Sequence, residues 1–218
     1  MILKKRCILC ENRISRAASV WDDRLICICE DCMREVDEDR AKRIIDTPPS
    51  ITSVIPIVYY DGKIREAIKK FKFDGHRGYG KAFEFIARTK LDTLWDEYMH
   101  DAIVTMPLSK ERMRERGFNQ SRFLSDALSR ALGIPVRDDY LEKVVDTKPQ
   151  SLLKYADRKL NIAGAYCVGG DVRGKNLILV DDIYTTGSTC GEAASTLMQN
   201  GARAVMAVVF AARRRLSR

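Results

Sequence analysis

The sequence lacks any long hydrophobic segment. No apolar run in its 218 residues approaches the roughly 20 residues that a bilayer-spanning helix needs. Residues 1–7 have no hydrophobic region after their basic residues, as a secretory signal would. The Gly-x-x-x-x-Gly-Lys-Ser/Thr pattern of a P-loop is also missing. We therefore expect a cytoplasmic protein without membrane insertion, and any phosphate site must be of a kind other than a P-loop.

The charge and the length of the chain limit its partners and its organisation. Lysine and arginine total 38 against 30 acidic residues, a net charge of +8. This balance favours anionic partners, either nucleic acid or phosphorylated small molecules, without choosing between them. The length suits one α/β domain with a small appendage. Because the adjacent prolines of Thr47–Ser50 end helices and stiffen a connector, we predict a module over residues 1–46 and a main domain over residues 51–218.

Cysteine is concentrated near the N-terminus, where five of the seven lie within residues 7–32. Two Cys-x-x-Cys pairs in this segment are separated by 18 residues, a spacing that suits one tetrahedral zinc ion held by four thiolates. Cys27 could replace Cys29, although Cys-x-Cys is a poorer metal-binding pair. Reduced cysteines in a small core are the alternative, but residues 1–35 hold too few large apolar side chains to fold without a metal. We predict a zinc ribbon with structural Zn²⁺ bound by Cys7, Cys10, Cys29 and Cys32.

Two adjacent carboxylates and a hydroxyl-rich turn follow a buried strand. Leu177–Val180 is apolar, and Asp181 and Asp182 come where such a strand would end. Ligands of open parallel sheets bind outside the carboxyl ends of the strands, and a helix N-terminus suits a phosphate. A capped strand–loop–helix connection is the alternative, but it explains only one hydroxyl. We predict a site for a phosphorylated ribose, with the acids facing sugar hydroxyls or Mg²⁺, and a turn made of Thr185, Thr186, Gly187, Ser188 and Thr189.

A second phosphate-binding candidate follows the strand predicted over residues 101–106. Cations gather just past the end of this strand, on a segment that ends at Gly117. Several cations on a backbone free to bend suit a polyphosphate. A solvated basic loop is the alternative. The candidates for a diphosphate-binding or DNA-binding loop are Ser109, Lys110, Arg112 and Arg116, with Arg114 between them.

A basic helix and nearby aromatic residues are weaker candidates for contacting nucleic acid. Residues 63–73 have helical spacing and carry five basic side chains, which most often form a solvated face. Phe71, Phe73 and Tyr79 could stack on bases, although aromatic residues at such spacing are more often part of a core.

Two motifs together resemble a known family. The block Leu179–Thr189 resembles the phosphoribosyl-pyrophosphate signature of type I phosphoribosyltransferases. With Pro107–Gln120, which reads Pro-Leu-Ser-Lys-x-Arg-x-x-x-Arg-Gly-Phe-Asn-Gln, the chain resembles the ComF family of competence proteins. The resemblance implies a type I phosphoribosyltransferase-like α/β fold, a mainly parallel sheet flanked by helices, with a small N-terminal zinc ribbon. One departure is Thr105, since Val-Pro-x-Pro is more usual than Val-Thr-Met-Pro at this strand end.

The resemblance also implies a function. Members of this family act in natural transformation, in the cytoplasm, and handle incoming single-stranded DNA beside a helicase-like partner. The alternative is an active phosphoribosyltransferase that transfers phosphoribosyl from phosphoribosyl pyrophosphate to an unknown acceptor. The sequence shows no acceptor pocket.

The same resemblance assigns roles to residues of the predicted site. Asp181 and Asp182 would hold the ribose at the catalytic centre, and the turn over residues 185–189 would bind the 5′-phosphate. The basic segment would bind the diphosphate with Mg²⁺. A mobile loop near residues 146–159 would close over the reaction centre, with contacts from Gln150, Lys154 and Arg158. An inert surface turn is the alternative for this segment.

Overall fold

The structure is a computed structural model that describes residues 5–14, 19–22, 26–38, 46–73, 78–91, 100–145 and 164–213. The chain begins with a small sheet in the order β2-β1-β4-β3, followed by one helix. Within it, β4 pairs in parallel with β1 and antiparallel with β3. These elements are β1 (Lys5–Cys7), β2 (Arg13–Ile14), β3 (Ser19–Asp22), β4 (Ile26–Cys29) and α1 (Glu30–Glu38).

The main domain is built on a four-stranded sheet in the order β5-β10-β9-β6. All three strand pairs are parallel, and the strands are rich in the apolar and β-branched residues that fill buried parallel sheets. This sheet confirms the predicted mainly parallel α/β architecture. The strands are β5 (Val54–Tyr59), β6 (Ala102–Thr105), β9 (Asn176–Tyr184) and β10 (Ala204–Ala212).

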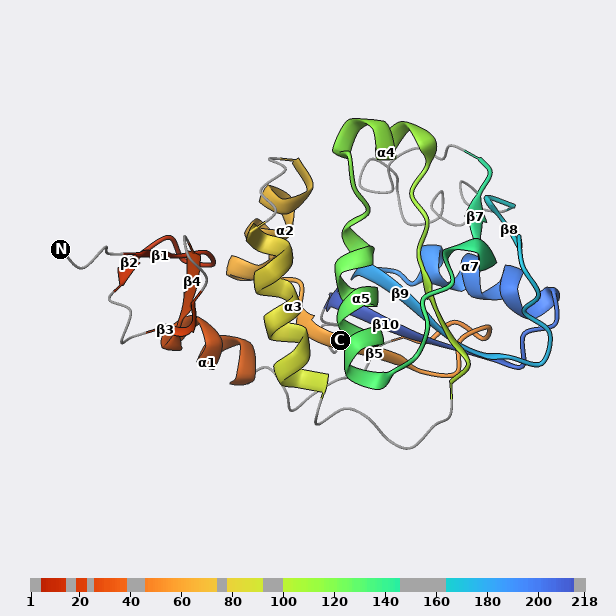
Figure 1. Ribbon diagram of the computed structural model, residues 1–218, viewed down its shortest axis with the longest axis horizontal. Helices are drawn as coiled ribbons and strands as arrows, with labels where there is room; N and C mark the ends of the chain where they lie inside the picture. The colour runs from red at the N-terminus through yellow and green to blue at the C-terminus, as the bar shows by residue number, and fades with distance from the viewer. Residues whose placement is uncertain are drawn as a thin grey trace.

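Helices cover both faces of this sheet (Figure 1). Buried side chains of three helices pack on one face, and those of α7 pack on the other. No helix in the described part of the chain is both long and apolar enough to span a membrane. The helices are α2 (Gly62–Phe73), α3 (Gly78–Leu91), α4 (Lys110–Arg116), α5 (Gln120–Leu132) and α7 (Ser188–Gln199), and the shorter elements are η3 (Asp138–Tyr140), β7 (Glu142–Lys143) and β8 (Tyr166–Cys167).

Strand β9 is buried on both sides, and its residues alternate between two cores. Ile178 and Val180 belong to the core beneath α2, α3 and α5. Leu177 and Leu179 belong to the core beneath α7. Each such side chain contributes about 1.5–3 kcal/mol on burial, so the register and direction of β9 are strongly fixed. The strand therefore holds whatever follows Val180 in a defined position.

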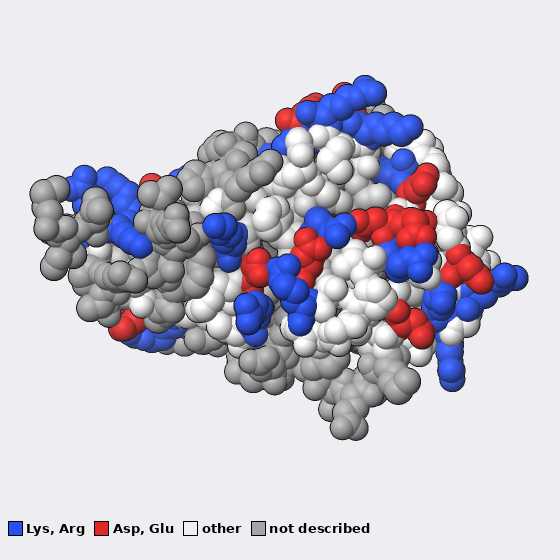
Figure 2. Space-filling view, viewed as in Figure 1, with Lys and Arg blue, Asp and Glu red and all other residues white. Residues whose placement is uncertain are grey.

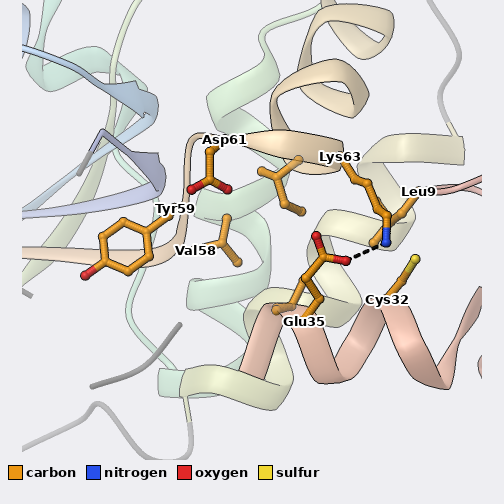
Figure 3. Close-up of a pocket in the computed structure, with 9 residues that line it drawn as sticks. Leu9, Cys32, Glu35, Val58, Tyr59, Asp61 and Lys63 are labelled. Carbon is orange, nitrogen blue, oxygen red and sulfur yellow. Dashed lines mark hydrogen bonds and ion pairs between the residues drawn. The ribbon is translucent and has the colours of Figure 1, made fainter. Parts of the chain in front are cut away.

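The N-terminal module packs against the main domain. Ile8, Leu9 and Ile28 share one apolar core with Ile57 and Ile64. Polar contacts reinforce this packing, because the Lys63 ammonium pairs with Glu35 of α1 and Lys70 pairs with Glu11. Figure 3 shows the Lys63–Glu35 pair beside Cys32, at a cavity between α1 and the β5–α2 connection. The division of the chain near residue 47 stays a prediction, since the packing joins its two sides.

Candidate functional site

The predicted acids and the predicted cations lie at the same edge of the sheet. β6 and β9 are parallel neighbours, with Thr105 opposite Val180. The backbone N–H of Met106 donates to the Val180 carbonyl at 2.8 Å. Pairing between the two strands ends here. β6 leads to α4 and β9 leads to the two acids. Because parallel strands end at a common edge, the topology brings the two predicted phosphate-binding segments together.

Asp181 is held by three donors and is only 8% exposed. Ser121 Oγ donates to its Oδ1 at 3.2 Å, and the backbone N–H of Asp182 donates to the same atom at 2.8 Å. The Cys190 thiol donates to its Oδ2 at 3.7 Å. Burial, followed by the negative charge of Asp182, raises the pKa of Asp181 to about 7, although the hydrogen bonds and Lys72 oppose that shift. This carboxyl group therefore gains and loses a proton near neutral pH.

Asp182 has different neighbours. Its Oδ2 pairs with Lys72 Nζ of α2 at 2.6 Å, with both side chains about one fifth exposed or less. The sequence predicted that the strand ends at Val180, but β9 continues to Tyr184. Since side chains of a strand alternate, the extension turns the adjacent acids toward opposite sides of the sheet. The site thus contains one buried carboxyl group and one ion-paired carboxylate.

The hydroxyl-rich turn leads directly into α7. Thr186 Oγ1 and Ser188 Oγ lie 2.9 Å apart in hydrogen-bond contact, and the Ser188 backbone N–H donates to Thr186 Oγ1. Gly187 is the N-cap of α7 with φ 73°, so the N-cap residue itself has no side chain with which to cap this helix. A Cβ at Gly187 would lie 2.2 Å from the Tyr184 hydroxyl, so the turn requires glycine here. Thr185 is exposed and Thr189 is half-buried, which leaves a hydroxyl-lined helix N-terminus that suits a phosphate.

The segment predicted as a basic loop forms a short helix. Ser109 caps α4 by accepting the Arg112 backbone N–H at 3.3 Å, and it is only 5% exposed. Lys110 and Arg114 are exposed, whereas Arg112 and Arg116 are half-buried. The cations therefore lie on two sides of α4, and Figure 2 shows basic side chains gathered over this part of the molecule. A helix replaces the loop because Ser109 and Gly117 cap its two ends.

Arg116 connects α4 to the acids of β9. Its Nη1 donates to Gln120 Oε1 at 3.0 Å. Burial lowers the pKa of the Arg116 guanidinium, and the nearby negative charge of Asp182 opposes that shift. Burial also raises the pKa of the Tyr166 hydroxyl, and the positive charge of nearby Arg112 opposes that rise. Of the predicted diphosphate-binding residues, Arg116 thus lies within electrostatic reach of Asp182 in the predicted ribose site.

Several residues of this site were not predicted from the sequence. Ser121 anchors Asp181, and its own carbonyl accepts from Ser125 Oγ, which in turn accepts from Thr105 Oγ1 at 2.9 Å. Thr105 therefore ties β6 to α5. In the sequence, Lys72 could be recognised only as one of the basic residues of a helix face. The predicted loop contacts Gln150, Lys154 and Arg158 lie outside the described residues.

The four predicted metal ligands form a compact cluster. The sulfur atoms of Cys7, Cys10, Cys29 and Cys32 all lie within 4.8 Å of one another. Cys10 Sγ and Cys29 Sγ are 3.8 Å apart, close to the separation of about 3.8 Å that two Zn–S bonds of about 2.3 Å impose in a tetrahedron. Cys27 instead donates its thiol to the Arg6 carbonyl at 3.2 Å. A hydrogen bond from Cys32 lowers the pKa of Cys7 to about 4. The cluster can hold a metal ion such as zinc.

The raised pKa of Asp181 predicts a pH-dependent stability. Between pH 4 and 7 the folded protein keeps a proton on this carboxyl group that the unfolded chain, with an Asp pKa of about 3.9, has lost. This group therefore makes the protein less stable as pH rises through that window. Asp181→Asn should remove this loss and gain stability over the unaltered protein, on the order of 2 kcal/mol between pH 5 and 8, as measured by urea unfolding. Asp171→Asn, at an exposed carboxylate, is the control and should show no such gain. If the free energy of unfolding of the unaltered protein and that of Asp181→Asn changed in parallel with pH, the raised pKa of Asp181 would be refuted.

The chain was compared with protein-family models and with solved structures. No protein-family model matches the chain. A purine phosphoribosyltransferase from Pyrococcus horikoshii is similar over 61% of this chain and 71% of its own, at 18% identity and a TM-score of 0.35. That score is too low to support the fold assignment, which depends on the parallel sheet.

The sequence relatives are more informative. The competence protein ComFC of Bacillus subtilis strain 168 is 32% identical over 142 residues, which cover 65% of this chain but only 56% of that protein. The DNA utilization protein YhgH of Escherichia coli K12 is 31% identical over 173 residues, which cover 75% of this chain and 73% of that protein. Because this second match extends over most of both proteins, the chain belongs to the family of ComF competence proteins and YhgH DNA utilization proteins.

Proposed function

We propose that the protein handles single-stranded DNA on a fold that binds phosphoribosyl pyrophosphate or a similar phosphate ligand. The observation that supports this most is the meeting of α4 and β9 at one sheet edge. There the charge of Asp182 acts on Arg116, so acids that suit a ribose and cations that suit a diphosphate lie side by side. The names of the relatives, competence protein and DNA utilization protein, support the DNA half of the proposal.

In the proposed donor site each group has a distinct role. Asp181 and Asp182 hold the ribose hydroxyls, and the turn over residues 185–189 binds the 5′-phosphate at the N-terminus of α7. Arg112 and Arg116 bind the diphosphate, and bound Mg²⁺ would neutralise part of its charge. Ser109 contributes by capping α4, because its hydroxyl accepts the Arg112 N–H.

An active phosphoribosyltransferase is the second candidate function. It is favoured by the same meeting of carboxylates and guanidinium groups, since such transfer needs a held ribose and a stabilised diphosphate leaving group. The two functions differ in turnover, because only the enzyme would release diphosphate. An assay for diphosphate release with nucleobases or DNA as acceptor separates them.

Removing both carboxylates tests the donor site. Isothermal titration of the unaltered protein with phosphoribosyl pyrophosphate and Mg²⁺ should give binding heat. Asp181→Asn with Asp182→Asn should weaken this binding at least tenfold, because charge-assisted hydrogen bonds to the ribose are lost. Asp171→Asn is a matched control at an exposed, distant carboxylate and should bind as before. No heat from the unaltered protein would refute the donor site.

Salt dependence tests the DNA contact. Affinity for single-stranded DNA should fall steeply as salt rises, since each phosphate contact contributes about 0.7 to the slope of log K against log salt. Lys110→Ala with Arg114→Ala should weaken binding and reduce the slope by about 0.7 per lost contact. Arg173→Ala, which removes an exposed cation paired with Asp171, should change neither. An affinity that does not depend on salt would contradict electrostatic DNA binding.

We also propose that the cysteine cluster binds one structural zinc. Elemental analysis should return about one zinc per chain, as a closed four-thiolate site requires. Cys29→Ser should lower the zinc content, whereas Cys27→Ser should retain it, because a serine hydroxyl can still donate to the Arg6 carbonyl. A protein that folds without zinc, or a loss of zinc in both variants alike, would contradict this assignment.

A further inference from the structure

One buried side-chain group has no hydrogen-bond partner in the part of the chain that the structure describes. It is the amide nitrogen Nε2 of Gln120. Gln120 begins α5 and is only 4% exposed. Its Oε1 accepts from Arg116 Nη1, and this contact fixes which way the amide faces. A buried donor left without a partner is unfavourable, so we expect these N–H groups to meet an atom of a ligand or of water.

Gln120 lines a cavity between the sheet and the helices α2, α3 and α5. The cavity has a volume of about 20 Å³, which is enough for a water molecule or for one oxygen atom of a ligand that enters from outside. Gln120 and Asp182 are the two polar residues that line it. The remaining lining is apolar and mostly aromatic, formed by Ile68, Phe71, Phe83, Phe123, Leu124 and Phe210.

Phe123 forms a fixed and partly open wall of this cavity. Its ring packs edge-on against Phe71, with centroids 5.3 Å apart, and it remains partly exposed. A Cβ at Gly80 would lie 2.5 Å from the ring, so the bare backbone of α3 lies directly against it. An aromatic ring that is held from two sides and still partly open suits stacking by a planar ligand.

We propose that this cavity binds the edge of an unpaired nucleobase. A nucleobase combines a flat π-face with hydrogen-bond acceptors in its plane. Its carbonyl oxygen or ring nitrogen would accept from Gln120 Nε2, while its face contacts Phe123. The Gln120 Nε2 donor lies among aromatic rings and so matches that combination. A purely apolar ligand would leave this donor unpaired. A free base and a base in a single strand present the same edge.

The cavity adjoins the proposed donor site. Asp182 lies on the cavity lining and, in the proposed function, also holds the ribose. The claim that the base lies beside the ribose rests on that proposed function. The binding of the base by Gln120 and Phe123 does not depend on it.

Two titrations of the full chain test this proposal. Thymidine and deoxyguanosine carry a base without phosphate. Calorimetry with these nucleosides therefore measures base binding without a contribution from contacts between phosphate and the basic side chains. The second titration compares a single strand with an abasic strand of equal length and equal backbone charge. Gln120→Met keeps the side-chain length but removes the Nε2 donor, together with the Oε1 acceptor of Arg116. Gln199→Met is the matched control, at an exposed glutamine of α7 that contacts Ser195.

We expect Gln120→Met to weaken nucleoside binding about five- to tenfold, as the loss of one hydrogen bond predicts, while Gln199→Met binds as before. Because Gln120→Met removes the acceptor of Arg116 Nη1 as well as the unpaired donor, urea unfolding of the variant is measured alongside to show that it is folded under the titration conditions. A strand that binds more tightly than its abasic counterpart, by a margin that Gln120→Met removes, identifies a DNA base as the occupant. Nucleoside binding with equal affinity for both strands identifies a free base.

Two results would overturn the proposal. One is the absence of nucleoside binding together with equal affinity for the strand and its abasic counterpart. The other is a Gln120→Met variant that binds nucleosides and strands as the unaltered protein does, in which case a structural water satisfies the amide. Titration with phosphoribosyl pyrophosphate separates this failure from that of the donor site. A base site can fail while that titration still gives heat, and it can hold where that titration gives none.

Discussion

The candidate site depends on the extension of β9 beyond its neighbour β6. β6 ends at Thr105, whereas β9 continues beside β10 to Tyr184. In this extension the chain is still a strand, so consecutive side chains face opposite ways. Asp181 thus enters a buried position below Ser121 and Cys190, and Asp182 meets Lys72. The different surroundings of the two acids follow from the strand geometry, since the two residues are adjacent in the sequence.

Features that depend on local pattern could be predicted from the sequence. The apolar run at Leu177–Val180 indicates a strand buried on both faces, and the structure has a parallel sheet there. The choice of Cys29 over Cys27 depended only on the length of a Cys-x-x-Cys turn, and in the structure Cys27 turns its thiol to a backbone carbonyl. Phe71 and Tyr79 are nearly fully buried, as aromatic residues at helical spacing usually are. Each of these features is decided within a few residues of chain.

Features that depend on partners distant in sequence could not be predicted. Lys72 lies more than a hundred residues before Asp182, and its pattern could not distinguish it from the solvated lysines of the same helix. For Ser109 the sequence predicts a ligand contact, which stays a prediction, and the structure adds that its hydroxyl caps α4. The orphaned amide of Gln120 is visible only once α5 is packed against the sheet. For such residues the decisive quantity is burial, and the chain alone does not give it.

The connector between the two predicted parts of the chain belongs physically to the candidate site. The Tyr184 hydroxyl donates to the Asp46 carbonyl at 2.6 Å, and Ser50 Oγ donates to the Gly191 carbonyl at 2.8 Å. Pro48 lies so close to α7 that a Cβ at Gly191 would be 3.1 Å from its ring. The connector thus touches the strand end below the hydroxyl turn and the first turn of the helix above it. A proline-stiffened segment held at both ends supports the turn from one side, so the composition break at residue 47 marks a structural support of the proposed phosphate site as well as the expected boundary.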